Sequence, residues 1–119
     1  MTALSNRVHI YARPGFKDAL VRCFSTVLGC GAPLTLDVPG LAQPILAWNF
    51  PSGGSLSVEF TRAALDEEQA RRGAWLEIKV EDPDAVKERI RAAGLASIAY
   101  LGNEYFVLPG GQVIRVVPA

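Results

Sequence analysis

Histidine and long apolar runs are scarce in this sequence of 119 residues, and neither sign of charge is in excess. The chain has one histidine, and its 12 basic residues balance its 12 acidic residues. A neutral chain lacks the positive potential of nucleic-acid-binding proteins, so we expect no nucleic-acid partner. No apolar run reaches the roughly 18 residues of a membrane span, and the opening MTALSNR lacks the apolar segment of a signal peptide. These absences predict a cytoplasmic protein without a membrane partner.

Cysteine occurs twice, at Cys23 and Cys30. Cys23 lies on the apolar face of an expected helix, and Cys30 lies just past the end of that helix. Seven helical residues span about 10 Å, which is too far for a disulfide. The sequence therefore predicts two free thiols in a reducing compartment, with Cys23 packed in the core.

Motifs for nucleotide binding and nucleophilic catalysis are also absent. The chain contains no G-x-S-x-G, no G-x-x-x-x-G-K-[ST] and no G-x-G-x-x-G, and neither cysteine has a histidine close by in the sequence. Neither phosphate binding by a glycine-rich loop nor a nucleophilic triad is therefore indicated.

The clearest structural signal that is present is the stretch Ala74–Gly94, AWLEIKVEDPDAVKERIRAAG. Its first part alternates apolar and charged residues, which is typical of a half-buried strand. Asp82 stands where a helix N-cap belongs, Pro83 fits the first helical position, and apolar residues then recur at helical spacing up to Gly94. The stretch predicts a strand, a tight connection and an amphipathic helix.

The same order of elements begins at Arg7, so the sequence predicts two copies of one structural unit. The expected elements are a strand over 7–12, a helix over 16–28, and strands over 34–38, 45–50 and 55–61, followed by a strand over 74–80, a helix over 83–93, and strands over 97–101, 104–108 and 112–117. A short helix is expected in the charged segment between the halves. We therefore predict one α+β domain over residues 1–119, with module 1 at about 6–62, a linker at 63–73 and module 2 at about 74–118.

Two βαβββ modules in this length resemble the glyoxalase / bleomycin-resistance / dioxygenase family, the vicinal oxygen chelate superfamily. The matching segments are RVHIYA, SLSVEF, WLEIKVEDPDAVKERIRAAG and YFVLPGGQVIRVV. The resemblance implies two modules side by side, with curled mixed sheets around a central cavity. It also implies that a metal-dependent member takes its ligands from the first and last strands of each module.

The four ligand positions of metal-dependent members fall on His9, Glu59, Trp75 and Arg115. Tryptophan offers no suitable donor and arginine is a permanent cation, so two of the four positions are lost. The resemblance therefore implies a protein without the standard metal site and without a cofactor. The alternative is one divalent ion, Fe(II), Mn(II) or Zn(II), held by His9, Glu59 and Glu77.

Strand parity places a second set of side chains on the face opposite the expected core. These residues are Arg7, His9, Tyr11, Ser55, Ser57, Glu59, Trp75, Glu77, Lys79, Val113, Arg115 and Val117. The candidate ligand-binding residues among them are Arg7, His9, Tyr11, Glu59, Trp75, Glu77 and Arg115. For two of the charged residues, the sequence predicts a structural ion pair between Glu59 and Arg115, with His9 as a neutral wall residue.

Three functions stay open at this point. The first is a metal-free small-molecule binder related to drug-sequestering members of the family. The second is a metal-dependent lyase, isomerase or dioxygenase, glyoxalase-like or extradiol-dioxygenase-like, and the third is a subunit whose interface matters more than its cavity. Uncovered sheet edges also predict a homodimer or, alternatively, a close internal pairing of the two halves of the chain. Aromatic faces and arginines on the candidate surface favour an aromatic-sized neutral or anionic ligand, whereas Glu59 and Glu77 favour a cation.

Overall fold

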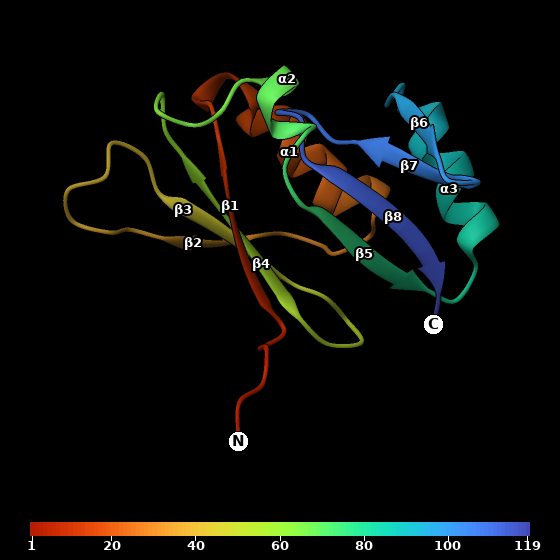
Figure 1. Ribbon diagram of the computed structural model, residues 1–119. Coiled ribbons are helices and arrows are strands. Elements are labelled where there is room, and N and C mark those ends of the chain that lie inside the picture. Colours follow the sequence, from red (N-terminus) through yellow and green to blue (C-terminus); the bar gives the residue numbers. More distant parts are fainter.

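The computed structural model describes residues 1–119 and contains two four-stranded mixed sheets built to one plan (Figure 1). Sheet A has the strand order β1 (Arg7–Ala12), β4 (Ser55–Phe60), β3 (Ile45–Asn49) and β2 (Leu34–Leu36). Sheet B has the order β5 (Trp75–Val80), β8 (Val113–Pro118), β7 (Asn103–Val107) and β6 (Ser97–Tyr100). β1 pairs with β4 in parallel, and β5 pairs with β8 in parallel. All other neighbouring strands are antiparallel. The predicted α+β fold of two βαβββ modules is confirmed.

The helices connect the strands as the repeat predicts. The first crossover runs through a 3₁₀ turn, η1 (Pro14–Phe16), the helix α1 (Lys17–Arg22) and a π-helical turn, η2 (Cys23–Val27). The second crossover is α3 (Pro83–Ala92), whose N-cap Asp82 accepts a hydrogen bond from the Ala85 backbone N–H at 3.2 Å. The linker contains the short helix α2 (Glu67–Ala70). None of these helices combines the length and the apolar character that crossing a membrane requires.

One hydrophobic core joins the two modules. It contains the strand residues that alternate with the candidate surface, such as Val58 and Ile114, and the inner sides of the helices, such as Phe24 and Ile90. Trp48 is buried in the same core, where its indole N–H donates to the Ser25 hydroxyl. The crossovers of the two modules also meet directly, because Arg89 Nε donates to the Val27 carbonyl at 3.1 Å. The modules therefore pack through their helices and inner sheet faces.

The two sheets are not closed into one. No strand of sheet A is hydrogen-bonded to a strand of sheet B, so the chain alone does not enclose the central cavity that the resemblance implied. The helices and the shared core occupy one face of each sheet. Each sheet consequently has an opposite face without a helix, which we call the open face of sheet A and the open face of sheet B.

A close contact between the β7–β8 turn and α2 holds the linker against module 2. In the turn between β7 and β8, Gly111 approaches α2 so closely that a Cβ atom there would lie 2.5 Å from the Glu67 carbonyl oxygen and 2.8 Å from the Ala70 Cβ. The neighbouring Gly110 faces Ala12 and Phe16 of module 1 at ordinary contact distances. This turn of module 2 therefore touches both the linker and module 1.

Candidate functional site

The strand register puts the candidate residues on the two open faces, as parity predicts. On sheet A, Arg7, His9 and Tyr11 of β1 lie opposite Ser55, Ser57 and Glu59 of β4. On sheet B, Trp75, Glu77 and Lys79 of β5 lie opposite Val113, Arg115 and Val117 of β8. The candidate residues thus form two groups, one on each sheet.

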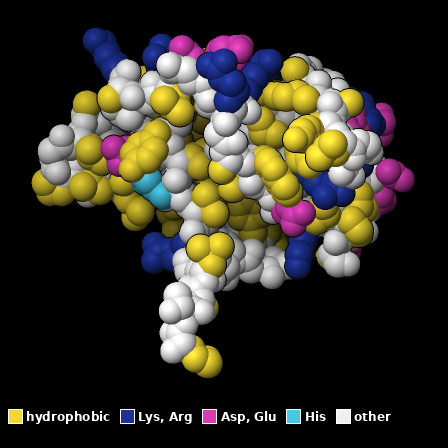
Figure 2. Space-filling model, viewed as in Figure 1, with side chains coloured by type: hydrophobic (Ala, Val, Ile, Leu, Met, Phe, Trp, Pro, Cys, Tyr) yellow, Lys and Arg dark blue, Asp and Glu magenta, His cyan; other side chains and the backbone are white.

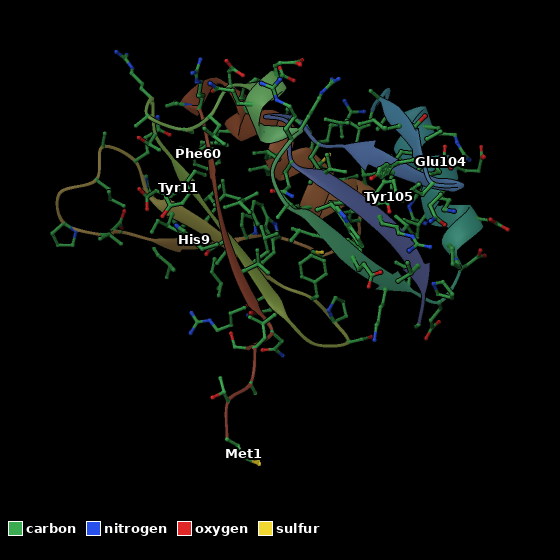
Figure 3. All side chains as sticks on the ribbon, in the orientation of Figure 1. Met1, His9, Tyr11, Phe60, Glu104 and Tyr105 are labelled. Atoms are coloured by element: carbon green, nitrogen blue, oxygen red, sulfur yellow. The ribbon has the colours of Figure 1, made fainter.

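His9 is the centre of the group on sheet A. Its Nδ1 lies 2.6 Å from the Ser57 hydroxyl oxygen, and its Nε2 lies 3.4 Å from Glu59 Oε1. A neutral imidazole that accepts from the serine hydroxyl carries its proton on Nε2, where it can donate to the carboxylate. The ring of Tyr11 packs edge-on against the imidazole, with centroids 5.0 Å apart. Figure 2 shows the histidine at the molecular surface, and Figure 3 shows His9 and Tyr11 following one another along β1.

Arg115 is the charged centre of the group on sheet B. Its Nη2 donates to the Asn103 side-chain oxygen at 2.9 Å, and its Nη1 lies 3.9 Å from Glu77 Oε1. The second distance is an ion-pair contact and too long for a hydrogen bond. The guanidinium therefore keeps donors free for a further partner.

An aromatic cluster lies on the same face of sheet B as Arg115. The rings of Trp75 and Tyr105 meet at 5.3 Å between centroids, and those of Tyr100 and Tyr105 at 6.3 Å, both edge-to-face. Tyr105 is buried, whereas Trp75 is 47% exposed and Tyr100 is 54% exposed. The open face of sheet B thus presents two accessible aromatic rings and a half-buried cation.

The predicted ion pair between Glu59 and Arg115 is wrong for the single chain. Glu59 contacts His9 on sheet A, and Arg115 contacts Asn103 and Glu77 on sheet B. Strand parity predicts the face of Glu59 and of Arg115 correctly. The predicted pair also required one cavity shared by the two sheets. Because the sheets are separate, Glu59 and Arg115 each contact a partner on their own sheet.

The donor set for a metal ion is incomplete within the chain. His9 and Glu59 lie side by side, but Glu77 belongs to the other sheet. No group of three or more histidine, cysteine, aspartate and glutamate side chains is placed to hold a metal ion. Three protein ligands are the usual minimum for a catalytic divalent site, so these residues do not fit such a site in one copy of the chain.

Sequence reasoning missed two partners, Ser57 as the hydrogen-bond partner of His9 and Asn103 as that of Arg115. Ser57 had been placed on the right face, and pairing β1 with β4 in parallel would have set it opposite His9. Asn103 lies between the expected strands over 97–101 and 104–108 and carries no predicted role. In the antiparallel pairing of β7 with β8, Tyr105 falls opposite Arg115, and Asn103 lies two residues further along β7 on the same face. The strand register is therefore the signal that could have predicted Ser57 and Asn103 as partners.

Comparisons with known proteins identify the fold. No family model matches the chain, and a search of curated protein sequences found no match. Among solved structures, the trypanothione-dependent glyoxalase I of Leishmania major matches with a TM-score of 0.75 and 16% identity, over 98% of this chain and 87% of that chain. The fosfomycin resistance protein FosX of Listeria monocytogenes, in complex with Mn(II) and 1S,2S-dihydroxypropylphosphonic acid, matches with a TM-score of 0.66 and 13% identity, over 98% and 90%. FosX of Mesorhizobium loti matches with a TM-score of 0.64 and 12% identity, over 100% of this chain and 93% of that chain.

These similarities confirm the resemblance inferred from the sequence at the level of the fold. The chain has the glyoxalase / bleomycin-resistance fold over nearly its whole length. At identities of 12–16% the similarity concerns the fold, and the function has to be argued from the chain's own residues.

Proposed function

We propose that this chain is a small-molecule-binding protein that takes an aromatic organic acid on the open face of sheet B and works without the standard metal site. The observation that carries the proposal is Arg115, a half-buried cation with spare donors on the same sheet face as the accessible rings of Trp75 and Tyr100. The proposal uses Arg115, Trp75 and Glu77 of the candidate residues, while Arg7, His9, Tyr11 and Glu59 lie on the other sheet.

The charge of Arg115 suits an acid. Its side chain is 32% exposed, and the only charged group in contact with it is Glu77 at 3.9 Å. A guanidinium has five N–H donors in one plane, and one of its nitrogens is occupied by the neutral Asn103. A ligand carboxylate can therefore add a two-pronged, charge-assisted contact from the solvent side.

The aromatic rings suit the body of such a ligand. Trp75 and Tyr100 keep half of their surface accessible, and the buried Tyr105 holds them in place through edge contacts. Stacking of a ligand ring on one of them contributes roughly 0.5–1.5 kcal/mol beyond the area it buries. Glu77 stands on the same face and disfavours a second negative charge, so we expect monoacids to bind better than diacids.

A thermal-shift screen tests this proposal. Naphthoate, the matched cation naphthylmethylammonium and the matched alcohol naphthylmethanol are compared on the wild type, on Arg115→Met and on Arg72→Met, a control that removes an exposed arginine of the linker. We expect naphthoate to raise the Tm of the wild type and of Arg72→Met more than that of Arg115→Met. A screen dominated by the cation, and abolished by Glu77→Gln, would overturn the choice of an acid.

A metal-dependent lyase, isomerase or dioxygenase is the second candidate. It is favoured by the contact of His9 with Glu59 at 3.4 Å on adjacent strands, which supplies two donors of the kind that Fe(II), Mn(II) and Zn(II) accept. Glu77 would have to join them from another copy of the chain. Equilibrium dialysis with each metal tests the candidate: a stoichiometric ion that is lost in both His9→Ala and Glu77→Gln supports it, and the absence of any bound ion removes it.

We also propose the cytoplasm as the compartment and a homodimer as the assembly. Both cysteines are free thiols, which is the usual state in a reducing compartment.

A further inference from the structure

A hollow of about 420 Å³ lies at the carboxyl ends of β1 and β4, away from Arg115 and the aromatic cluster. One wall is the end of β4 and the residues after it, Glu59–Arg62, and Pro14 of η1 adds to that side. The opposite wall is the loop segment Gly40–Gln43, which precedes β3. The hollow therefore lies between the end of β4 and a loop.

Glu59 supplies the negative charge of this hollow. Its side chain is 24% exposed, and its one polar contact is the 3.4 Å contact of Oε1 with His9. The second carboxylate oxygen has no partner in the chain. Arg62 also lines the hollow, but it is an exposed residue, so Glu59 is the more enclosed of the two charged side chains.

The loop wall of the hollow contributes free acceptors. Between residues 37 and 44, the only backbone carbonyl that accepts a backbone hydrogen bond is that of Val38, from the Leu41 N–H. The carbonyls of Gly40–Gln43 therefore accept no backbone hydrogen bond. The loop also brings donors, namely the Gln43 amide and the N–H groups of Gly40, Ala42 and Gln43, which donate no backbone hydrogen bond either. A carboxylate beside free carbonyl oxygens can hold a head group that carries positive charge and N–H donors.

We propose that this hollow is a binding site for a small organic cation, with a primary ammonium or guanidinium group held by Glu59 and the carbonyls of the 40–43 loop. The site is separate from the aromatic-acid site of the proposed function, because it lies on sheet A and uses neither Arg115 nor Trp75. The two sites can therefore be tested and can fail independently.

Amide chemical shifts in solution test the proposal. The probes are n-butylguanidinium and n-butylammonium, with n-pentanol as the neutral probe of similar length, all in the presence of a chelator that removes divalent metals. We expect the cations to shift the amide signals of Gly40–Ala42 and Thr61 with saturation, and n-pentanol to leave them in place. Arg115→Met should bind the cations as the wild type does.

Two matched carboxylate variants complete the test. Glu59→Gln keeps the shape of the side chain and removes its charge, and we expect cation affinity to fall by about tenfold or more, which corresponds to about 1.4 kcal/mol. Glu77→Gln makes the same change on sheet B and should leave the affinity unchanged. Equal binding of n-pentanol, an unchanged affinity in Glu59→Gln, or shifts centred on Trp75 and Tyr105 would each overturn the proposal.

Discussion

Cys23 shows at the scale of one residue how burial controls chemistry in this fold. The thiol lies in the shared core, and desolvation by burial raises its pKa from 9.0 to about 11, only partly offset by the nearby charge of Arg22. Burial also raises the pKa of Cys30, which is less enclosed. Because the thiolate is the reactive form, both thiols are poor nucleophiles in the folded protein.

The raised pKa of Cys23 predicts a loss of stability at high pH. The unfolded thiol ionises near pH 9, whereas the folded thiol stays protonated until about pH 11, so the contribution to stability is full below pH 9 and is lost as the pH rises towards 11. Urea unfolding between pH 8 and 11 measures this loss. We expect the wild type to lose more stability than Cys23→Ala over that range. Parallel pH profiles for the two proteins would contradict the assignment.

Individual residues also show where sequence reasoning reaches its limit. Alternation along the strands predicted the face on which His9, Glu59, Glu77 and Arg115 lie, because period-2 alternation depends only on the local backbone. It did not predict their partners, since these depend on the arrangement of one sheet relative to the other. The predicted ion pair between Glu59 and Arg115 is wrong for that reason.

At the scale of elements, the two modules could be predicted from the sequence because each contains its own local signals for strand and helix boundaries. The capping Asp82, the proline after it and the hairpin glycines all lie at element boundaries. The linker helix α2 is likewise capped locally, by the reciprocal contacts of Asp66 and Gln69. The segment 37–44 has no such periodicity, and the hollow that it forms with the end of β4 could not be anticipated from the sequence.

The contact of the β7–β8 turn with α2 predicts an unusual cost at Gly111. Gly110 and Gly111 have φ values of +90° and +100°, so alanine is strained at both. Only at Gly111 would the added Cβ also collide with α2, at 2.5 Å from a backbone oxygen. We expect Gly111→Ala to destabilise the fold by about 1–3 kcal/mol more than Gly110→Ala, which is the cost of overpacking. Equal losses in urea unfolding would show that α2 yields freely.

At the scale of the whole molecule, the open face of sheet A predicts a homodimer. Leu34 and Leu36 of its edge strand β2 are large apolar side chains that remain substantially exposed in the single chain. Light scattering should give twice the chain mass of 12.8 kDa. Leu36→Glu should lower the mass towards that of one chain, whereas Leu65→Glu, at a more exposed site in the linker (57% against 46%), should not. A wild type of single-chain mass would remove the dimer.

The central claim is that an aromatic acid binds against Arg115 and Trp75 on the open face of sheet B. The chain has two indole N–H groups that report on it separately, because Trp48 is buried and bonded to Ser25 while Trp75 is half exposed. The decisive measurement is the titration of both indole signals with naphthoate by NMR, in the wild type and in Arg115→Met. The account predicts a saturable shift of the Trp75 signal in the wild type, no shift of the Trp48 signal, and an affinity at least about tenfold weaker in Arg115→Met. A Trp75 signal that does not move, or one that moves equally in Arg115→Met, would contradict it.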